Sequence, residues 1–127
     1  FIERHDLHAF KMNPHFPVMS LQIIRGAIAA ENDGYLEDYI DKVLVHMWEE
    51  PKKMDDPEVI KAAFEESGFD ANKLMEQMQD PEVKAKLISN TEAAVERGVF
   101  GIPTFFAGDE MFFGKDRLWE VEELLND

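Results

Sequence analysis

Cysteine is absent from the 127 residues of this sequence, and positive charge is scarce. Without thiols the chain forms no disulfide, offers no thiolate nucleophile and builds no cysteine-ligated zinc site. Only 13 Lys and Arg residues stand against 27 Asp and Glu residues, so the formal net charge is −14. A surface of this sign repels phosphate backbones and anionic lipid. The composition therefore predicts neither nucleic acid nor a membrane as a partner.

Long apolar runs are lacking too. The longest, LQIIRGAIAA, is interrupted by Arg25 and falls short of the roughly 18 residues that a membrane-spanning helix needs. No signal-peptide pattern stands at the start, so we predict a cytoplasmic protein. The sequence opens with FIERHDLHAF, without methionine or a helix cap, as though a helix were already under way. We expect that the natural chain begins upstream of Phe1.

Proline, glycine and aspartate mark the predicted starts and ends of helices in the middle of the sequence. The segment Ala9–Asn13 is predicted as a strand, because the two prolines of PHFP forbid a helix there and favour an extended exit. Beyond it, apolar residues recur at three- and four-residue steps between capping and stop signals. Helices are predicted from Ser20 to Gly34, from Leu36 to Trp48, from Asp56 to Gly68, after Asp70, and from Asp80 to Gly98. Residues 20–98 are thus expected to be helical, with no repeat or linker.

From Phe100 on, the sequence pattern predicts strands instead of helices. PTFFA and EMFF flank Gly108-Asp109, which suits a hairpin with a two-residue type II′ turn. Both strands are apolar throughout, so we expect other elements to cover both faces. Asp116 is predicted to cap a last helix with one apolar stripe.

Patterns for catalysis and metal binding are weak. The four histidines lack ligand spacing, adjacent carboxylates on a helix point apart, and no serine has the context of a nucleophile. We therefore predict no metal site, and surface or packing roles for the histidines. The seven methionines are interpreted mainly as core residues. His15 and Phe16, held between Pro14 and Pro17, could line a pocket or simply form a loop.

Two features beside the hairpin could bind a peptide-like ligand. A cis Ile102–Pro103 bond at the start of the strand would turn the N–H and C=O of Ile102 outward, toward an extended ligand. Gly114-Lys115-Asp116 leads into a helix N-terminus, which favours a carboxylate, and the Asp116 side chain could accept an ammonium if it is not the cap. On the residues alone, a plain turn and a plain cap explain these features equally well.

The stretch AVERGVFGIPTFFAGDEMFFGKDRL resembles the C-terminal signature of 2-hydroxychromene-2-carboxylate isomerases and kappa-class glutathione transferases. NPHFP followed by LQIIRGAIAA is similar to the strand, loop and helix that enter the helical insertion of these proteins. The resemblance implies an α/β, thioredoxin-like fold at residues 1–17 and 99–127, with an inserted α-helical domain at residues 18–98. It also implies glutathione as cofactor and a homodimer.

The same resemblance implies site residues. Pro103 would be the cis-proline, Ile102 would pair with the cysteinyl unit of glutathione, and Phe113, Gly114, Lys115 and Asp116 would form the γ-glutamyl corner. His15 and Phe16 would lie at the edge of a small aromatic carboxylate substrate. Lys115 departs from the small polar residue that is common at its position.

No part of the sequence matches the family's N-terminal βα unit, with its Ser-Pro-Tyr-Ser-like motif. The resemblance therefore places the catalytic serine upstream of Phe1 and implies that these 127 residues alone are inactive. The expected function is that of a glutathione-dependent isomerase of aromatic degradation, present as a C-terminal fragment. A kappa-class transferase, a DsbA-like disulfide oxidoreductase with an upstream Cys-x-x-Cys, and a non-enzymatic helical module are the alternatives. The charged corner favours the isomerase over the oxidoreductase, because protein thiols carry no γ-glutamyl group.

Overall fold

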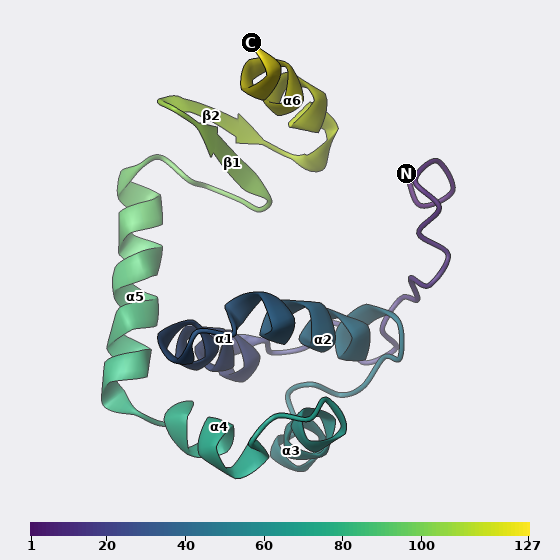
Figure 1. Ribbon diagram of the computed structural model, residues 1–127, viewed down its shortest axis with the longest axis vertical. Coiled ribbons are helices and arrows are strands. Elements are labelled where there is room, and N and C mark those ends of the chain that lie inside the picture. Colours follow the sequence, from purple (N-terminus) through teal and green to yellow (C-terminus); the bar gives the residue numbers. More distant parts are fainter. The chain divides into compact units, whose positions relative to one another are not determined.

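The computed structural model describes residues 1–127, which divide into two compact units, residues 1–88 and residues 89–127 (Figure 1). Helix α5 (Pro81–Glu96) runs across the division between the units. None of the helices has the length and apolar character needed to cross a membrane. The predicted assignment of residues 1–17 and 99–127 to one domain, and 18–98 to another, stays a prediction.

The first unit is helical, with α1 (Leu21–Asp33), α2 (Leu36–Trp48), α3 (Pro57–Glu66), α4 (Ala71–Gln77) and the start of α5. Helix α1 packs on α2 and α4, and α3 packs on α4. Aspartate caps act as predicted: the carboxylates of Asp56 and Asp70 accept backbone N–H groups in the first turns of α3 and α4. Gly34 ends α1 in the left-handed region, at φ 85°. Ser20 precedes α1 but forms no capping hydrogen bond.

Tyr39 lies at the centre of the first unit's core. Its ring is buried near the rings of Phe64 and Phe69, and its hydroxyl donates to the Ile23 carbonyl over 2.7 Å. Gly26 allows this approach, because a Cβ at that position would lie 2.1 Å from the tyrosine oxygen. Methionines contribute to the same core, namely Met47, Met54 and Met78, whereas Met12 and Met19 are exposed. The core interpretation of the methionines is therefore confirmed for only part of the set.

The predicted strand at Ala9–Asn13 is wrong. The segment pairs with no strand, and the Lys11 N–H and the Asn13 side chain donate instead to carbonyls at the end of α2. Before it, the Leu7 N–H donates to the Ile2 carbonyl (3.0 Å), with Asp6 at φ 54°. This pattern is typical of the closing turn of a helix.

The second unit holds the end of α5, an antiparallel hairpin of β1 (Thr104–Ala107) and β2 (Glu110–Phe113), the 3₁₀ turn η1 (Lys115–Arg117) and α6 (Leu118–Asn126). Ala107 pairs with Glu110 across a two-residue turn in which Gly108 has φ 61°, as the predicted hairpin requires. Helix α6 packs on β1, and Phe112 is buried. Phe113 remains 41% exposed, so the prediction that both faces are covered is wrong for that side chain.

Candidate functional site

The end of α2 anchors the segment that carries the first group of predicted site residues. The last four carbonyls of a helix have no partner within the helix. In α2 the first two accept N–H groups from the loop that follows. The other two, at Met47 and Trp48, accept the side-chain amide of Asn13 (3.1 Å) and the N–H of Lys11. Residues far away in the sequence therefore complete the cap of this helix.

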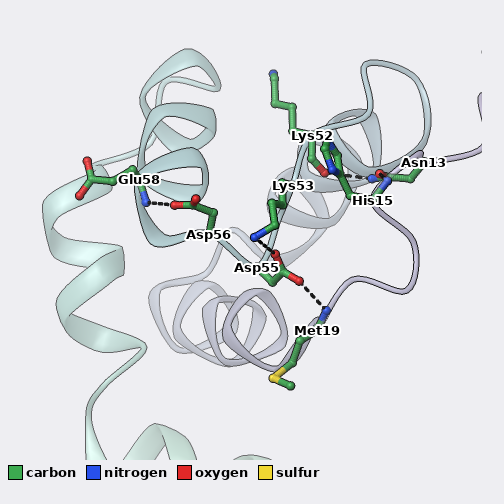
Figure 2. A network of polar contacts seen from close by, with 8 residues as sticks. All are labelled: Asn13, His15, Met19, Lys52, Lys53, Asp55, Asp56 and Glu58. Carbon is green, nitrogen blue, oxygen red and sulfur yellow. Dashed lines mark hydrogen bonds and ion pairs between the residues drawn. The ribbon is translucent and has the colours of Figure 1, made fainter.

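Asn13 makes most of the hydrogen bonds that attach this segment to the end of α2 and the loop after it, and its side chain is almost completely buried. Its Nδ2 donates to the carbonyls of Met47 and Lys52, the latter over 2.9 Å. Its Oδ1 accepts the N–H of His15 over 2.9 Å (Figure 2). The Asn13 carbonyl accepts the Phe16 N–H over 3.1 Å. Asn13 thus fixes the backbone of both predicted substrate-binding residues.

Phe16 lies beside an aromatic wall. Its ring, 57% exposed, has its centroid 6.3 Å from that of Trp48, which also stacks with Phe10 at 5.8 Å. An apolar hollow of about 250 Å³ opens next to the Phe10 and Trp48 rings, and its lining comprises Leu7, Ala9, Phe10, Leu44, Trp48 and Glu49. His15 is exposed in the same loop. The structure therefore brings Phe16 to an aromatic surface, whereas it shows no contact of the His15 ring with that surface.

Asp55 holds the far end of the same loop. Its Oδ2 accepts the N–H of Met19 over 3.2 Å, and Oδ1 lies 3.5 Å from the Lys53 ammonium (Figure 2). The Met19 N–H first, and Lys53 in addition, lower the pKa of the Asp55 carboxyl, because both favour its charged form. The loop that follows α2 therefore anchors the chain on both sides of His15 and Phe16.

In the second unit, Ile102 presents its backbone at the start of the hairpin. The Ile102–Pro103 peptide bond is cis, and β1 begins at Thr104, one residue after the predicted start at Pro103. The Pro103 carbonyl accepts the Gly114 N–H over 2.9 Å, which continues the pairing beyond β1 and β2. The Ile102 side chain is 89% exposed, and neither its N–H nor its C=O takes part in a hydrogen bond of the structure.

The predicted corner is built around Gly114, which has φ 100°. A Cβ there would lie 2.6 Å from Oδ1 of Asp116, so only glycine lets the carboxylate fold back over the backbone. The prediction that Asp116 caps the last helix is wrong, because Asp116 lies inside η1 and α6 begins at Leu118. The Gly114 N–H, already bound to Pro103, is likewise not available to a ligand carboxylate.

Charges around the corner are partly neutralised. Arg117 pairs with both carboxylate oxygens of Glu120 at 2.5 Å, and its guanidinium lies 4.8 Å from the centroid of the Phe112 ring. The pair raises the pKa of Arg117 and lowers that of Glu120, while the nearby Asp116 charge adds to the effect on Arg117. The Asp116 side chain caps neither η1 nor α6 and remains exposed. Its carboxylate can therefore receive a cation.

Two residues that the sequence analysis did not single out are central to the first unit. Asn13 could have been found, because an asparagine before proline favours a turn closed by its own side chain. No sequence pattern singles out His46. Its side chain is buried, with the residue 4% exposed. Its Nδ1 lies 2.6 Å from the Lys52 ammonium and its Nε2 lies 2.7 Å from the Ser67 hydroxyl. No group of three or more His, Asp and Glu side chains is placed to hold a metal ion.

Comparisons with known proteins agree with this architecture. The sequence is 29% identical over 138 residues to human glutathione S-transferase kappa 1, covering 94% of this chain and 61% of the relative. It is 32% identical over 87 residues to 2-hydroxychromene-2-carboxylate isomerase of Pseudomonas putida, covering 68% of this chain and 43% of the relative. A solved structure of 2-hydroxychromene-2-carboxylate isomerase superposes with a TM-score of 0.81 at 26% identity, over 98% of this chain and 62% of that one.

The chain thus spans less than two thirds of each of these relatives. The sequence model described as "DSBA-like thioredoxin domain" matches residues 6–126. The helices and the two-stranded hairpin are therefore parts of an α/β thioredoxin fold of the DsbA type, as the sequence predicts. This chain belongs to the DsbA-like thioredoxin domain family.

Proposed function

We propose that this chain forms part of a glutathione-dependent isomerase acting on aromatic carboxylates of the 2-hydroxychromene-2-carboxylate type. In this role it supplies the backbone at Ile102, the γ-glutamyl corner and one wall of the substrate site. Two kinds of relative support the proposal, since one is named a glutathione transferase and the other an isomerase. Because the chain spans only part of either, the activity proposed is that of the whole protein, a cytoplasmic homodimer.

The observation that carries the proposal is the corner formed by Gly114 and Asp116. The α-ammonium of a γ-glutamyl group needs an accessible carboxylate, and Asp116 offers one because it is exposed and does not cap α6. The residues fit glutathione in a second respect. The Ile102 N–H and C=O, unused within the chain, can pair with the peptide-like middle of an extended ligand. Glutathione, when bound, supplies a thiol that this cysteine-free chain lacks.

The rings of Phe16 and Trp48 favour the proposal that the substrate is aromatic. Rings held about 4.5–7 Å apart form stacked or tilted pairs that can accept a further ring at their exposed face. The 6.3 Å spacing of Phe16 and Trp48 and the apolar hollow beside Trp48 provide such a face. Asn13 and Asp55 form hydrogen bonds with the backbone on either side of Phe16. The position of Phe16 is therefore set before a substrate binds.

The corner is tested by titrating Asp116→Asn with reduced glutathione and with the dipeptide Cys-Gly, which lacks the γ-glutamyl group. Deleting a charge-assisted hydrogen bond should weaken glutathione binding by about 1–3 kcal/mol, or roughly 5- to 150-fold. Binding of Cys-Gly should not change. Asp109→Asn is the matched control, because Asp109 is also exposed but lies in the hairpin turn. Equal glutathione affinity for the two variants would refute the role of Asp116.

The second candidate function is a kappa-class glutathione transferase, favoured by the human relative's match to 94% of this chain. Both functions use the same corner, so binding of glutathione does not separate them. Turnover of the whole protein does: the isomerase converts a chromene carboxylate without consuming glutathione, whereas the transferase consumes one glutathione per product.

A further inference from the structure

A buried histidine at the end of α2 has an unusual set of neighbours. The Lys52 ammonium lies 2.6 Å from Nδ1 of His46 and also donates to Oε2 of Glu66 over 2.8 Å. Because an ammonium can only donate, Nδ1 must be the acceptor and carry no proton. The ring proton then sits on Nε2, which donates to the Ser67 hydroxyl over 2.7 Å. His46 is therefore neutral, and it cannot act as a base toward Ser67.

The surroundings of His46 oppose a second proton. Glu66, Glu50 and the Ala63 carbonyl of α3 favour the charged ring, whereas burial and the Lys52 ammonium oppose it. Burial is the largest influence and Lys52 the next, so the pKa of His46 lies below its ordinary value of 6.5. A proton on Nδ1 would also place two donors against each other at hydrogen-bonding distance, and that contact cannot persist.

Lys52 connects this pair to the loop at the candidate site. Its backbone N–H donates to the His46 carbonyl over 2.9 Å, and its carbonyl accepts Nδ2 of Asn13 over 2.9 Å. The residue whose side chain contacts the histidine is thus the one whose backbone holds Asn13. Displacement of Lys52 acts directly on the hydrogen bond that fixes the Asn13–Pro17 loop.

We propose that His46 and Lys52 form a latch that positions the Asn13–Pro17 loop while His46 is neutral and releases it when His46 binds a proton. The two residues are positioning residues, since they act through Asn13 and do not themselves line the hollow beside Trp48. The latch rests on the proposed function only for the claim that this loop borders the substrate. Release of the loop is measured without substrate or glutathione, so its failure is distinguishable from failure of that function.

Trp48 provides the readout. The chain has two tryptophans, and a Trp119→Phe, His15→Gln background leaves Trp48 as the only one and removes the imidazole next to Phe16 in the sequence. Acrylamide quenching of Trp48 is followed from about pH 7.5 to about pH 5, the range in which histidine titrates. We expect quenching to rise in one step with a midpoint below pH 6.5, the ordinary histidine value. His46→Gln should abolish the step.

A second pair of variants keeps the proposal testable if His46→Gln fails to fold, which far-UV circular dichroism at pH 7.5 shows. Lys52→Met removes the ammonium through which a protonated His46 acts on the loop, so the step in quenching should be lost. Lys53→Met is the matched control, because the Lys53 ammonium faces Asp55 instead of His46. The latch is refuted if folded His46→Gln keeps the step, or if Lys52→Met shows the same step as Lys53→Met.

Discussion

Replacing Asn13 with alanine tests the anchor on which the candidate site depends. The substitution removes three hydrogen bonds, of 3.1, 2.9 and 2.9 Å, to the Met47 carbonyl, the Lys52 carbonyl and the His15 N–H. The Lys52 carbonyl keeps a second donor, the Met54 N–H at 3.0 Å. The Met47 carbonyl, at the buried end of α2, keeps none in the structure.

The loss in the free energy of unfolding depends on how well each of the three partners is satisfied after the substitution. Each hydrogen bond contributes about 1 kcal/mol net, and a buried acceptor left without a donor costs about 1–3 kcal/mol. Water can replace the lost partners at the part-buried His15 and Lys52 groups more easily than at Met47. We therefore expect Asn13→Ala to lower the free energy of unfolding by about 2–4 kcal/mol.

Urea unfolding followed by circular dichroism measures this change. With a denaturant slope of about 2 kcal/mol per molar, the midpoint should fall by about 1–2 M. Asn72→Ala is the matched control, because Asn72 is exposed on α4 and its loss should change stability by less than about 0.5 kcal/mol. If Asn13→Ala unfolds at the same urea concentration as Asn72→Ala, Asn13 does not anchor the loop.

Two further substitutions test the core and the loop exit. Gly26→Ala should gain about 1 kcal/mol of helix propensity, yet its Cβ would meet the Tyr39 hydroxyl and break that group's bond to the Ile23 carbonyl. We expect a net loss of about 2–3 kcal/mol in the same urea assay, and a more stable variant would contradict the packing described. Asp55→Asn should destabilise the chain at pH 7, because it removes the charge that accepts the Met19 N–H. The folded pKa of Asp55 lies below the ordinary 3.8, so this stabilisation is present above pH 3.8 and lost as pH falls through the folded value. Unfolding curves of the two proteins should therefore converge at acid pH, and a constant difference down to about pH 2 would refute the assignment.

Much of the secondary structure could be predicted from the sequence, because the residues that start and end the helices act on backbone groups close to them in the chain. Asp56, Asp70 and Gly34 act on backbone groups within a few residues, so their sequence context is sufficient. The Gly108-Asp109 turn is equally local. The error at Ala9–Asn13 has the opposite cause, since the partners of this segment lie more than 30 residues away, at the end of α2.

The candidate site was predictable to the extent that it depends on backbone conformation. Gly114 needs a positive φ, and Pro103 stands immediately before a strand, which are properties that a sequence displays. The side chain of Asp116 was misassigned, because a 3₁₀ turn postpones the start of α6 by two residues. His46 was missed altogether, since its partners come from the loop after α2 and from the end of α3.

The contact between Asn13 and Lys52 also closes a loop of 39 residues that contains both α1 and α2. Bringing the ends of such a loop together costs about 3 kcal/mol of chain entropy, whereas the two side-chain hydrogen bonds of Asn13 that span it, to the Met47 and Lys52 carbonyls, contribute about 2 kcal/mol. These two bonds therefore do not hold the loop closed by themselves. Closure depends on the helices inside the loop being packed, and the chain around Phe16 becomes ordered only together with them.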